Sequence, residues 1–132
     1  VLMLTGCAGV NESAASSRLT TASESSAFAA RVEVQHPGAP WVNKIVIRLY
    51  VRDGSAEGVA TAVREAATAA AADADLKDSD LTFIAYEGRP EENSQIDDLR
   101  IMGSVSEIVG GKGAEGILDL SAADVRRLAD DQ

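Results

Sequence analysis

The sequence has one cysteine, one histidine and few aromatic residues, and each shortage excludes a class of protein. A single cysteine forms no internal disulfide, and with one histidine it cannot complete a zinc site of the usual four ligands. Aromatic residues make up only 4% of the chain, so we expect a thin core of small aliphatic side chains. After residue 7, no stretch approaches the ~20 apolar residues of a membrane-spanning helix.

Basic residues are also scarce, with 12 lysines and arginines against 21 acidic residues and a net charge of −9. Nucleic-acid binding depends on clustered positive charge, so we expect no nucleic-acid partner. The simplest consequence of the acidity is solubility. Hydrophobic residues make up 45% of the 132 residues, an ordinary share for a globular protein, and predict that most of the chain folds.

The chain opens on an apolar stub that ends in its single cysteine, Cys7. Leu4-Thr5-Gly6-Cys7 resembles the lipobox of bacterial lipoproteins, in which an aliphatic residue, a small residue and glycine or alanine precede the cysteine. The resemblance implies that diacylglycerol is attached to the Cys7 sulfur and that the chain is cut just before it. The stub is shorter than a complete signal and has no basic start. We therefore expect residues 1–7 to be a truncated lipoprotein signal.

Residues 8–27 are rich in serine, alanine and threonine, with only Val10 and Leu19 as larger apolar residues. Such a composition buries too little surface to order itself, so the sequence predicts a disordered tether. A flexible coil of this length spans roughly 25 Å. A tether of that reach would hold a folded domain clear of the lipid headgroups.

The composition extends the resemblance. With three lysines against nine arginines and abundant alanine, the chain resembles the small lipoproteins of high-GC Gram-positive bacteria. The resemblance implies a palmitate-type lipid anchor on Cys7, a place on the extracytoplasmic face of the cell membrane and a protein partner in the cell envelope. It implies no particular activity. If the chain is not exported, a cytoplasmic scaffold is the alternative.

Residues 28–132 alternate between strand and helix patterns, which predicts a single α+β domain. Alternating apolar residues predict strands over residues 31–36, 42–52 and 81–87, and a short one over 116–120. The first two strands are close enough in sequence to pair antiparallel. The strand–helix–strand unit that follows predicts a right-handed crossover with parallel neighbours.

Helical spacing predicts a helix from the N-cap Ser55 to about Ala72 and a second one after Ser121. Residues 95–109 fit either a helix that stops at Gly110 or a strand, and we favour the helix. The expected fold is a two-layer α+β sandwich, with an about four-stranded mixed sheet and two to three helices on one face.

The outer sheet face is the predicted interaction surface. The alternation puts Arg48, Tyr50 and Arg52 on that face, and Trp41 precedes the same strand. Arginines beside tyrosine and tryptophan are typical of binding hot spots, and the outer face of a two-layer domain can be open to solvent. The alternative is that these arginines only pair across strands with Glu33 and other acids.

Three further features have weaker interpretations. His36 lies at a strand end before a turn and is expected to be a surface residue. Gly110 to Gly113 reads GGKG, but it lacks the first glycine and the Ser/Thr of a phosphate loop, so a flexible loop is expected. Residues 73–80, DADLKDSD, alternate acids like a calcium loop, but Asp78 and Ile84 replace its glycine and glutamate.

Two function classes therefore compete. The first is a non-enzymatic interaction or accessory module at the cell envelope. The second is a small-ligand or weak calcium-binding domain that uses the loop of residues 73–80. A small hydrolase ranks last because no Ser-His-acid set or supported carboxylate pair is present, so we predict no catalytic residue, metal ligand or cofactor.

Overall fold

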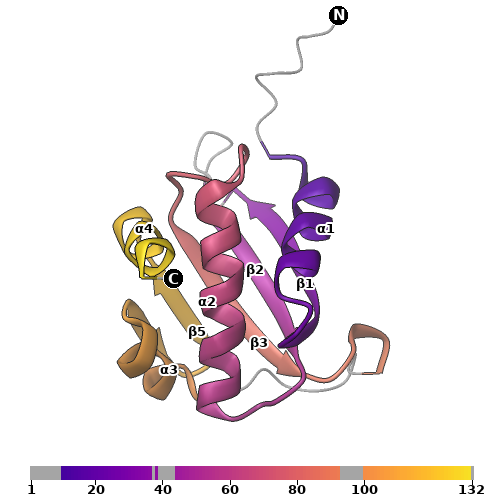
Figure 1. Cartoon of the computed structure of the whole chain (residues 1–132), viewed down its shortest axis with the longest axis vertical. Helices are drawn as coiled ribbons and strands as arrows, with labels where there is room; N and C mark the ends of the chain where they lie inside the picture. Colours follow the sequence, from indigo (N-terminus) through magenta and orange to yellow (C-terminus); the bar gives the residue numbers. More distant parts are fainter. Residues whose placement is uncertain (1–9, 37, 39–43, 93–99, 132) are drawn as a thin grey trace, which may run out of the picture.

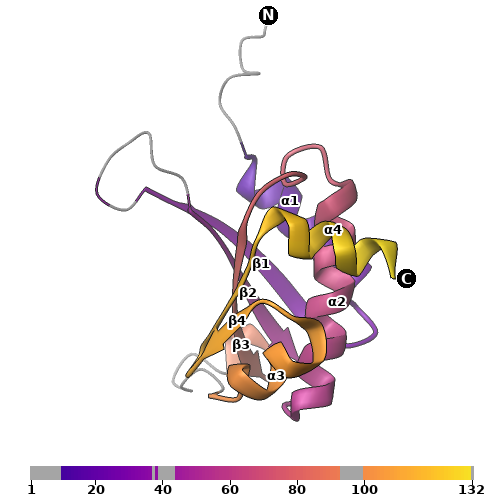
Figure 2. The same ribbon diagram turned by 90° about the vertical axis from the view of Figure 1, so that its left-hand side faces the viewer.

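Four helices cover one face of a five-stranded mixed sheet (Figures 1 and 2). The computed structural model describes residues 10–36, 38, 44–92 and 100–131. The strands are β1 (Ala27–Gln35), β2 (Lys44–Val51), β3 (Leu81–Glu87), β4 (Lys112–Ala114) and β5 (Ile117–Leu120). The helices are α1 (Glu12–Ala22), α2 (Ala56–Ala72), α3 (Met102–Val109) and α4 (Ala122–Asp130), and the 3-10 turn η2 (Pro90–Glu92) follows β3.

The strands lie in the order β1-β2-β3-β5-β4. β1 and β2 pair antiparallel, and α2 carries the chain to β3, which is parallel to β2; both pairings were predicted. β5 is antiparallel to β3 and to β4. The α+β, two-layer prediction is confirmed, with five strands in place of about four and four helices in place of two to three. The additional elements are β4 and α1.

The core lies between the sheet and α2, which crosses the middle of the sheet (Figure 1). The helix turns small side chains inward at helical spacing, and β2 and β3 contribute aliphatic residues and Phe83. Alanines at the contact let the helix backbone approach the strands closely. The buried residues of α2 are Val59, Ala60, Ala62, Val63, Ala66, Ala67 and Ala70.

Local capping sets where the helices begin. The Ser55 side chain accepts a hydrogen bond from the backbone N–H of Gly58 at 3.1 Å, as expected of an N-cap. Ser121 and Asp124 form a reciprocal capping box at the start of α4. α3 ends at Gly110, whose φ of +92° suits glycine. The helix predicted over residues 95–109 is thus confirmed from Met102; residues 95–99 lie outside the described part.

The prediction of a disordered tether over residues 8–27 is wrong for the described part of that segment. Asn11 caps α1 by accepting a hydrogen bond from the backbone N–H of Ala14 at 3.1 Å. Ala15 and Leu19, one helical turn apart, are both fully buried, and Val10 packs against the core. Residues from Val10 onward therefore belong to the folded domain, which was predicted to start at residue 28.

Helix α1 packs beside the edge strand β1, and its polar side chains bond to the backbone of that strand. Ser16 Oγ accepts from the backbone N–H of Val32 at 2.8 Å, and Glu12 Oε2 accepts from that of Val34 at 2.6 Å. Thr20 Oγ1 accepts from the N–H of Ala30 and donates to its carbonyl, both at 3.0 Å. The helix thus bonds to edge groups of β1 that would otherwise be open to a further strand.

Two smaller expectations also meet the structure. The GGKG segment is not only a loop, because Lys112 to Ala114 form β4 and pair with β5. A Cβ on Gly113 would lie 1.9 Å from the carbonyl oxygen of Met102, so glycine is needed for the close approach of α3. Within the described residues, no helix combines the length and the hydropathy that crossing a membrane requires.

Candidate functional site

The sheet face opposite the helices carries a group of aromatic side chains. In the described part of the chain, no helix or strand lies over this face (Figure 2). Tyr50 of β2 and Tyr86 of β3 are register partners, and their rings stack with centroids 5.0 Å apart and planes at 17°. Both side chains are half-buried. The stack provides a flat apolar surface between two parallel strands.

Two arginines converge on a third aromatic ring at the same end of the sheet. The guanidinium carbons of Arg52 and Arg89 each lie 4.4 Å from the ring centroid of Phe28. Arg52 follows β2 and Arg89 follows β3, and both residues are exposed. Arg52 Nε also donates to the backbone carbonyl of Glu24 at 3.0 Å, which helps to fix its side chain.

The remaining arginines of this face differ in their partners. Arg48 forms an ion pair with Glu33 on the neighbouring strand, so the cross-strand pairing expected as the alternative holds for this residue. Arg31, directly opposite Arg48 in the register, lies 5.9 Å from the ring centroid of Tyr50. Arg31 therefore adds a positive charge beside the tyrosine stack.

Together these side chains form what we call the arginine–aromatic patch: Phe28, Arg31, Tyr50, Arg52, Tyr86 and Arg89. It holds three of the five aromatic residues of the chain and three of its nine arginines. Within the described residues, no carboxylate lies at ion-pair distance from Arg31, Arg52 or Arg89. The patch thus brings together three arginines on a chain whose net charge is −9.

The structure places Arg48, Tyr50 and Arg52 on the outer face, as the alternation predicted. Trp41 and Cys7 lie outside the described residues. The sequence analysis missed Phe28, Tyr86 and Arg89. For Tyr86 a signal was present, because it alternates with Phe83 and Ala85 in β3 and so falls on the opposite face.

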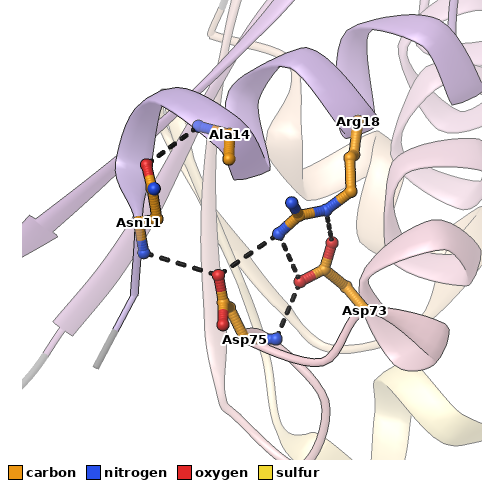
Figure 3. A network of polar contacts seen from close by, with 5 residues as sticks. All are labelled: Asn11, Ala14, Arg18, Asp73 and Asp75. Atoms are coloured by element: carbon orange, nitrogen blue, oxygen red, sulfur yellow. Dashed lines mark hydrogen bonds and ion pairs between the residues drawn. The ribbon is translucent and has the colours of Figure 1, made fainter. Parts of the chain in front are cut away.

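The loop of residues 73–80 holds α1 in place (Figure 3). Arg18 donates from Nε to Asp73 Oδ2 at 2.5 Å and from Nη2 to Asp73 Oδ1 at 3.1 Å. The same Nη2 reaches Asp75 Oδ2 at 3.2 Å, and the backbone N–H of Asn11 donates to that oxygen at 3.4 Å. The side chain of Asp73 is only 3% exposed, so its charge depends on Arg18.

Acidification should weaken this contact. The hydrogen bond from Arg18 holds the pKa of Asp73 below its ordinary value of 3.8. A lowered pKa means that the pair stabilises the fold above pH 3.8 and that this stabilisation is lost as the pH falls through the pKa of the folded state. We expect Arg18→Gln to lower the Tm at pH 7, and the difference from the wild type to shrink below pH 3.8.

The control for this prediction is Arg126→Gln, which removes the ion pair with Asp78 at 3.2 Å, whose side chain is 73% exposed. Exposed pairs contribute little, so its Tm should stay near that of the wild type at every pH. Thermal melts from pH 7 to pH 2 measure both variants. A difference between Arg18→Gln and the wild type that did not change with pH would contradict the assigned role of Asp73.

The other acids of the loop also have partners, which weighs against the calcium-loop interpretation. Asp78 pairs with Arg126, and Asp80 accepts a hydrogen bond from the backbone N–H of Ala122 at 2.8 Å. Across the described ranges, no three histidine, cysteine, aspartate or glutamate side chains come together where they could hold a metal ion. His36 is exposed just after β1, as expected of a surface residue.

Comparison of the chain with protein-family models, with curated proteins and with solved structures finds no match in any of the three. The function must therefore be argued from the patch, the fold and the sequence.

Proposed function

We propose that this chain is a non-enzymatic interaction module, anchored by a lipid on Cys7 at the outer face of the cell membrane. Its binding surface is the outer sheet face with the arginine–aromatic patch. The observation that carries the proposal is the Tyr50–Tyr86 stack, flanked by arginines on a face that no described helix or strand covers. Tryptophan, tyrosine and arginine are the residue types most enriched in binding hot spots.

The start of the domain at residue 10 changes the geometry of the proposed anchor. Only Ala8 and Gly9 separate Cys7 from Val10, which packs against the core. The three peptide steps from Cys7 to Val10 reach at most about 10 Å. A lipid on Cys7 would therefore hold the start of α1 close to the bilayer, rather than let the domain roam above it.

The patch lies at the end of the sheet away from the start of α1, to which this anchor would be joined. The start of α1 lies beside the end of β1, since Glu12 bonds to the backbone of Val34. Phe28 is at the opposite end of that strand, and the start of β1 lies at the end of the sheet away from the start of α1 (Figure 1). From Phe28 to Val34 the strand rises about 20 Å. A partner in the cell envelope could then reach the patch without competing with lipid headgroups.

The anchor is tested by expressing the wild type and Cys7→Ala from the genomic coding region in a bacterial host, with cell fractionation and mass analysis of the N-terminal peptide. We expect the wild type in the membrane fraction, with its N-terminal peptide starting at a diacylglyceryl-modified Cys7. Cys7→Ala should lose both properties. A soluble wild type with an unmodified Cys7 would contradict the anchor and favour the cytoplasmic scaffold.

The surface is tested by photo-crosslinking in the same cells. A photoreactive phenylalanine replaces Arg31 on the patch or, as the control, Ile108, which is 42% exposed on α3 in the helical layer. We expect a discrete protein adduct from position 31 and none from position 108. Equal adducts from both positions, or an adduct from position 108 alone, would show that the outer sheet face is not the binding surface.

A further inference from the structure

The two guanidinium groups on Phe28 indicate what kind of partner the patch accepts, and the inference rests on the proposed function. We infer that Arg52 and Arg89 bind carboxylates of an extended acidic segment of a partner protein. The Tyr50–Tyr86 stack is then the adjoining apolar platform for the rest of that segment.

The charges of Arg52 and Arg89 favour an anionic partner. Arg52 and Arg89 lie at the same short distance, 4.4 Å, from one ring, and each carries a full positive charge at any physiological pH. Two positive charges held near each other repel, and a bound anion removes this repulsion. Acidic residues lie close to both arginines along the chain, with Asp53 directly after Arg52 and Glu91 two residues after Arg89, but none of the ion pairs among the described residues involves either arginine.

Both guanidinium groups are also ordered before any partner binds. Stacking on Phe28 restricts both guanidinium groups, and the bond from Arg52 to the carbonyl of Glu24 restricts one of them further. Groups that are already ordered lose less conformational entropy on binding. A planar guanidinium with free N–H groups matches a carboxylate with two parallel hydrogen bonds. The geometry therefore suits carboxylate recognition better than recognition of a neutral peptide.

The position of the patch favours an acidic polypeptide over an anionic bilayer as the partner. The patch is at the end of the sheet away from the start of α1, so an anchor on Cys7 holds it off the membrane. The favoured occupant is thus a protein segment that carries aspartate or glutamate.

The test uses the whole chain with Cys7→Ser, isotope-labelled for NMR, and hexaglutamate as the probe. Hexaglutamine is the neutral peptide control, and phosphatidylglycerol vesicles represent the bilayer. We expect saturable shifts of the Phe28, Tyr50 and Arg52 amide signals with hexaglutamate that weaken with added salt, and none with hexaglutamine.

Hexaglutamate binding is also compared between two double variants, each of which removes two positive charges. Arg52→Gln with Arg89→Gln should weaken hexaglutamate binding by about tenfold or more, since each lost charge-assisted hydrogen bond costs about that factor. Arg64→Gln with Arg126→Gln, on helices α2 and α4, should change it by less than about twofold. Thermal melts verify that both variants fold.

No saturable shift with hexaglutamate, or an equal loss in both double variants, would overturn the inference. Binding to the vesicles without a response to hexaglutamate would assign the patch to an anionic bilayer and would also overturn it. If hexaglutamate fails while the crosslink from position 31 persists, the sheet face binds a partner that is not recognised through carboxylates. If both fail, the proposed function itself is wrong.

Discussion

Leu19→Ala lowers the free energy of unfolding by about 2–5 kcal/mol, the range for removing most of a buried leucine side chain. Leu19 is fully buried between α1 and the rest of the core, so alanine would leave a cavity there. In a disordered tether the same change would have almost no effect. The measurement is urea unfolding of the wild type and the variant, followed by circular dichroism.

The control for Leu19→Ala is Ser17→Ala on the same helix, because Ser17 is exposed. It should change stability by less than about 0.5 kcal/mol, as surface substitutions usually do. If both variants unfold at the same urea concentration, α1 contributes nothing to the domain and residues 10–22 act as a tether after all.

Replacing both Ser16 and Thr20 with valine should destabilise the fold by about 2–4 kcal/mol and promote self-association. Valine matches threonine in shape and is one methyl group larger than serine, and at both positions it removes the hydroxyl that bonds to β1. A partly buried backbone group without a partner costs about 1–3 kcal/mol. An edge strand whose N–H and carbonyl groups are unpaired also invites pairing with a second copy of the chain.

Sedimentation velocity at several concentrations measures the self-association, and urea unfolding measures the loss of stability. The matched control is Ser17→Val with Thr21→Val, the same two residue types at exposed positions of α1. It carries the same loss of helix propensity but leaves the bonds to β1 intact. A double variant at Ser16 and Thr20 that behaved like this control would mean that their hydroxyls do not protect the edge.

The bonds between α1 and the edge strand β1 affect how a lipid anchor on Cys7 would act on the domain. Glu12, Ser16 and Thr20 hold α1 on β1, and Arg18 holds it on the loop after α2. A pull on residues just before Val10 would thus be transmitted to an edge strand and to a buried carboxylate. The contacts of α1 would thus carry such a pull from Val10 into the body of the domain.

The apolar periodicity of the sequence was enough to predict most of the domain. The helix capped by Ser55 and the strand from Leu81 to Glu87 both appear with the predicted bounds. Such elements bury a regular apolar face, and the spacing of that face differs between a helix and a strand. Whether such an element is a helix or a strand can therefore be predicted from its own segment of the sequence.

Helix α1 could not be found in this way, because its buried apolar residues are only Ala15 and Leu19. Its other contacts are polar ones to β1 and to Asp73, ten or more residues away along the chain. A stripe of Glu12, Ser16 and Thr20 looks the same in a tether and in a helix on a strand edge. One signal was present, in Asn11 as an N-cap with Ala15 and Leu19 one turn apart.

The candidate site could likewise be predicted only in part from the sequence. Alternation within β2 determined that Arg48, Tyr50 and Arg52 share the outer face, since successive residues of a strand point to opposite sides. Only the tertiary structure decided that Tyr86 stacks on Tyr50 and that Arg52 and Arg89 both approach Phe28. Those contacts depend on strand order and register, which arise from long-range pairing and leave no trace in any single segment.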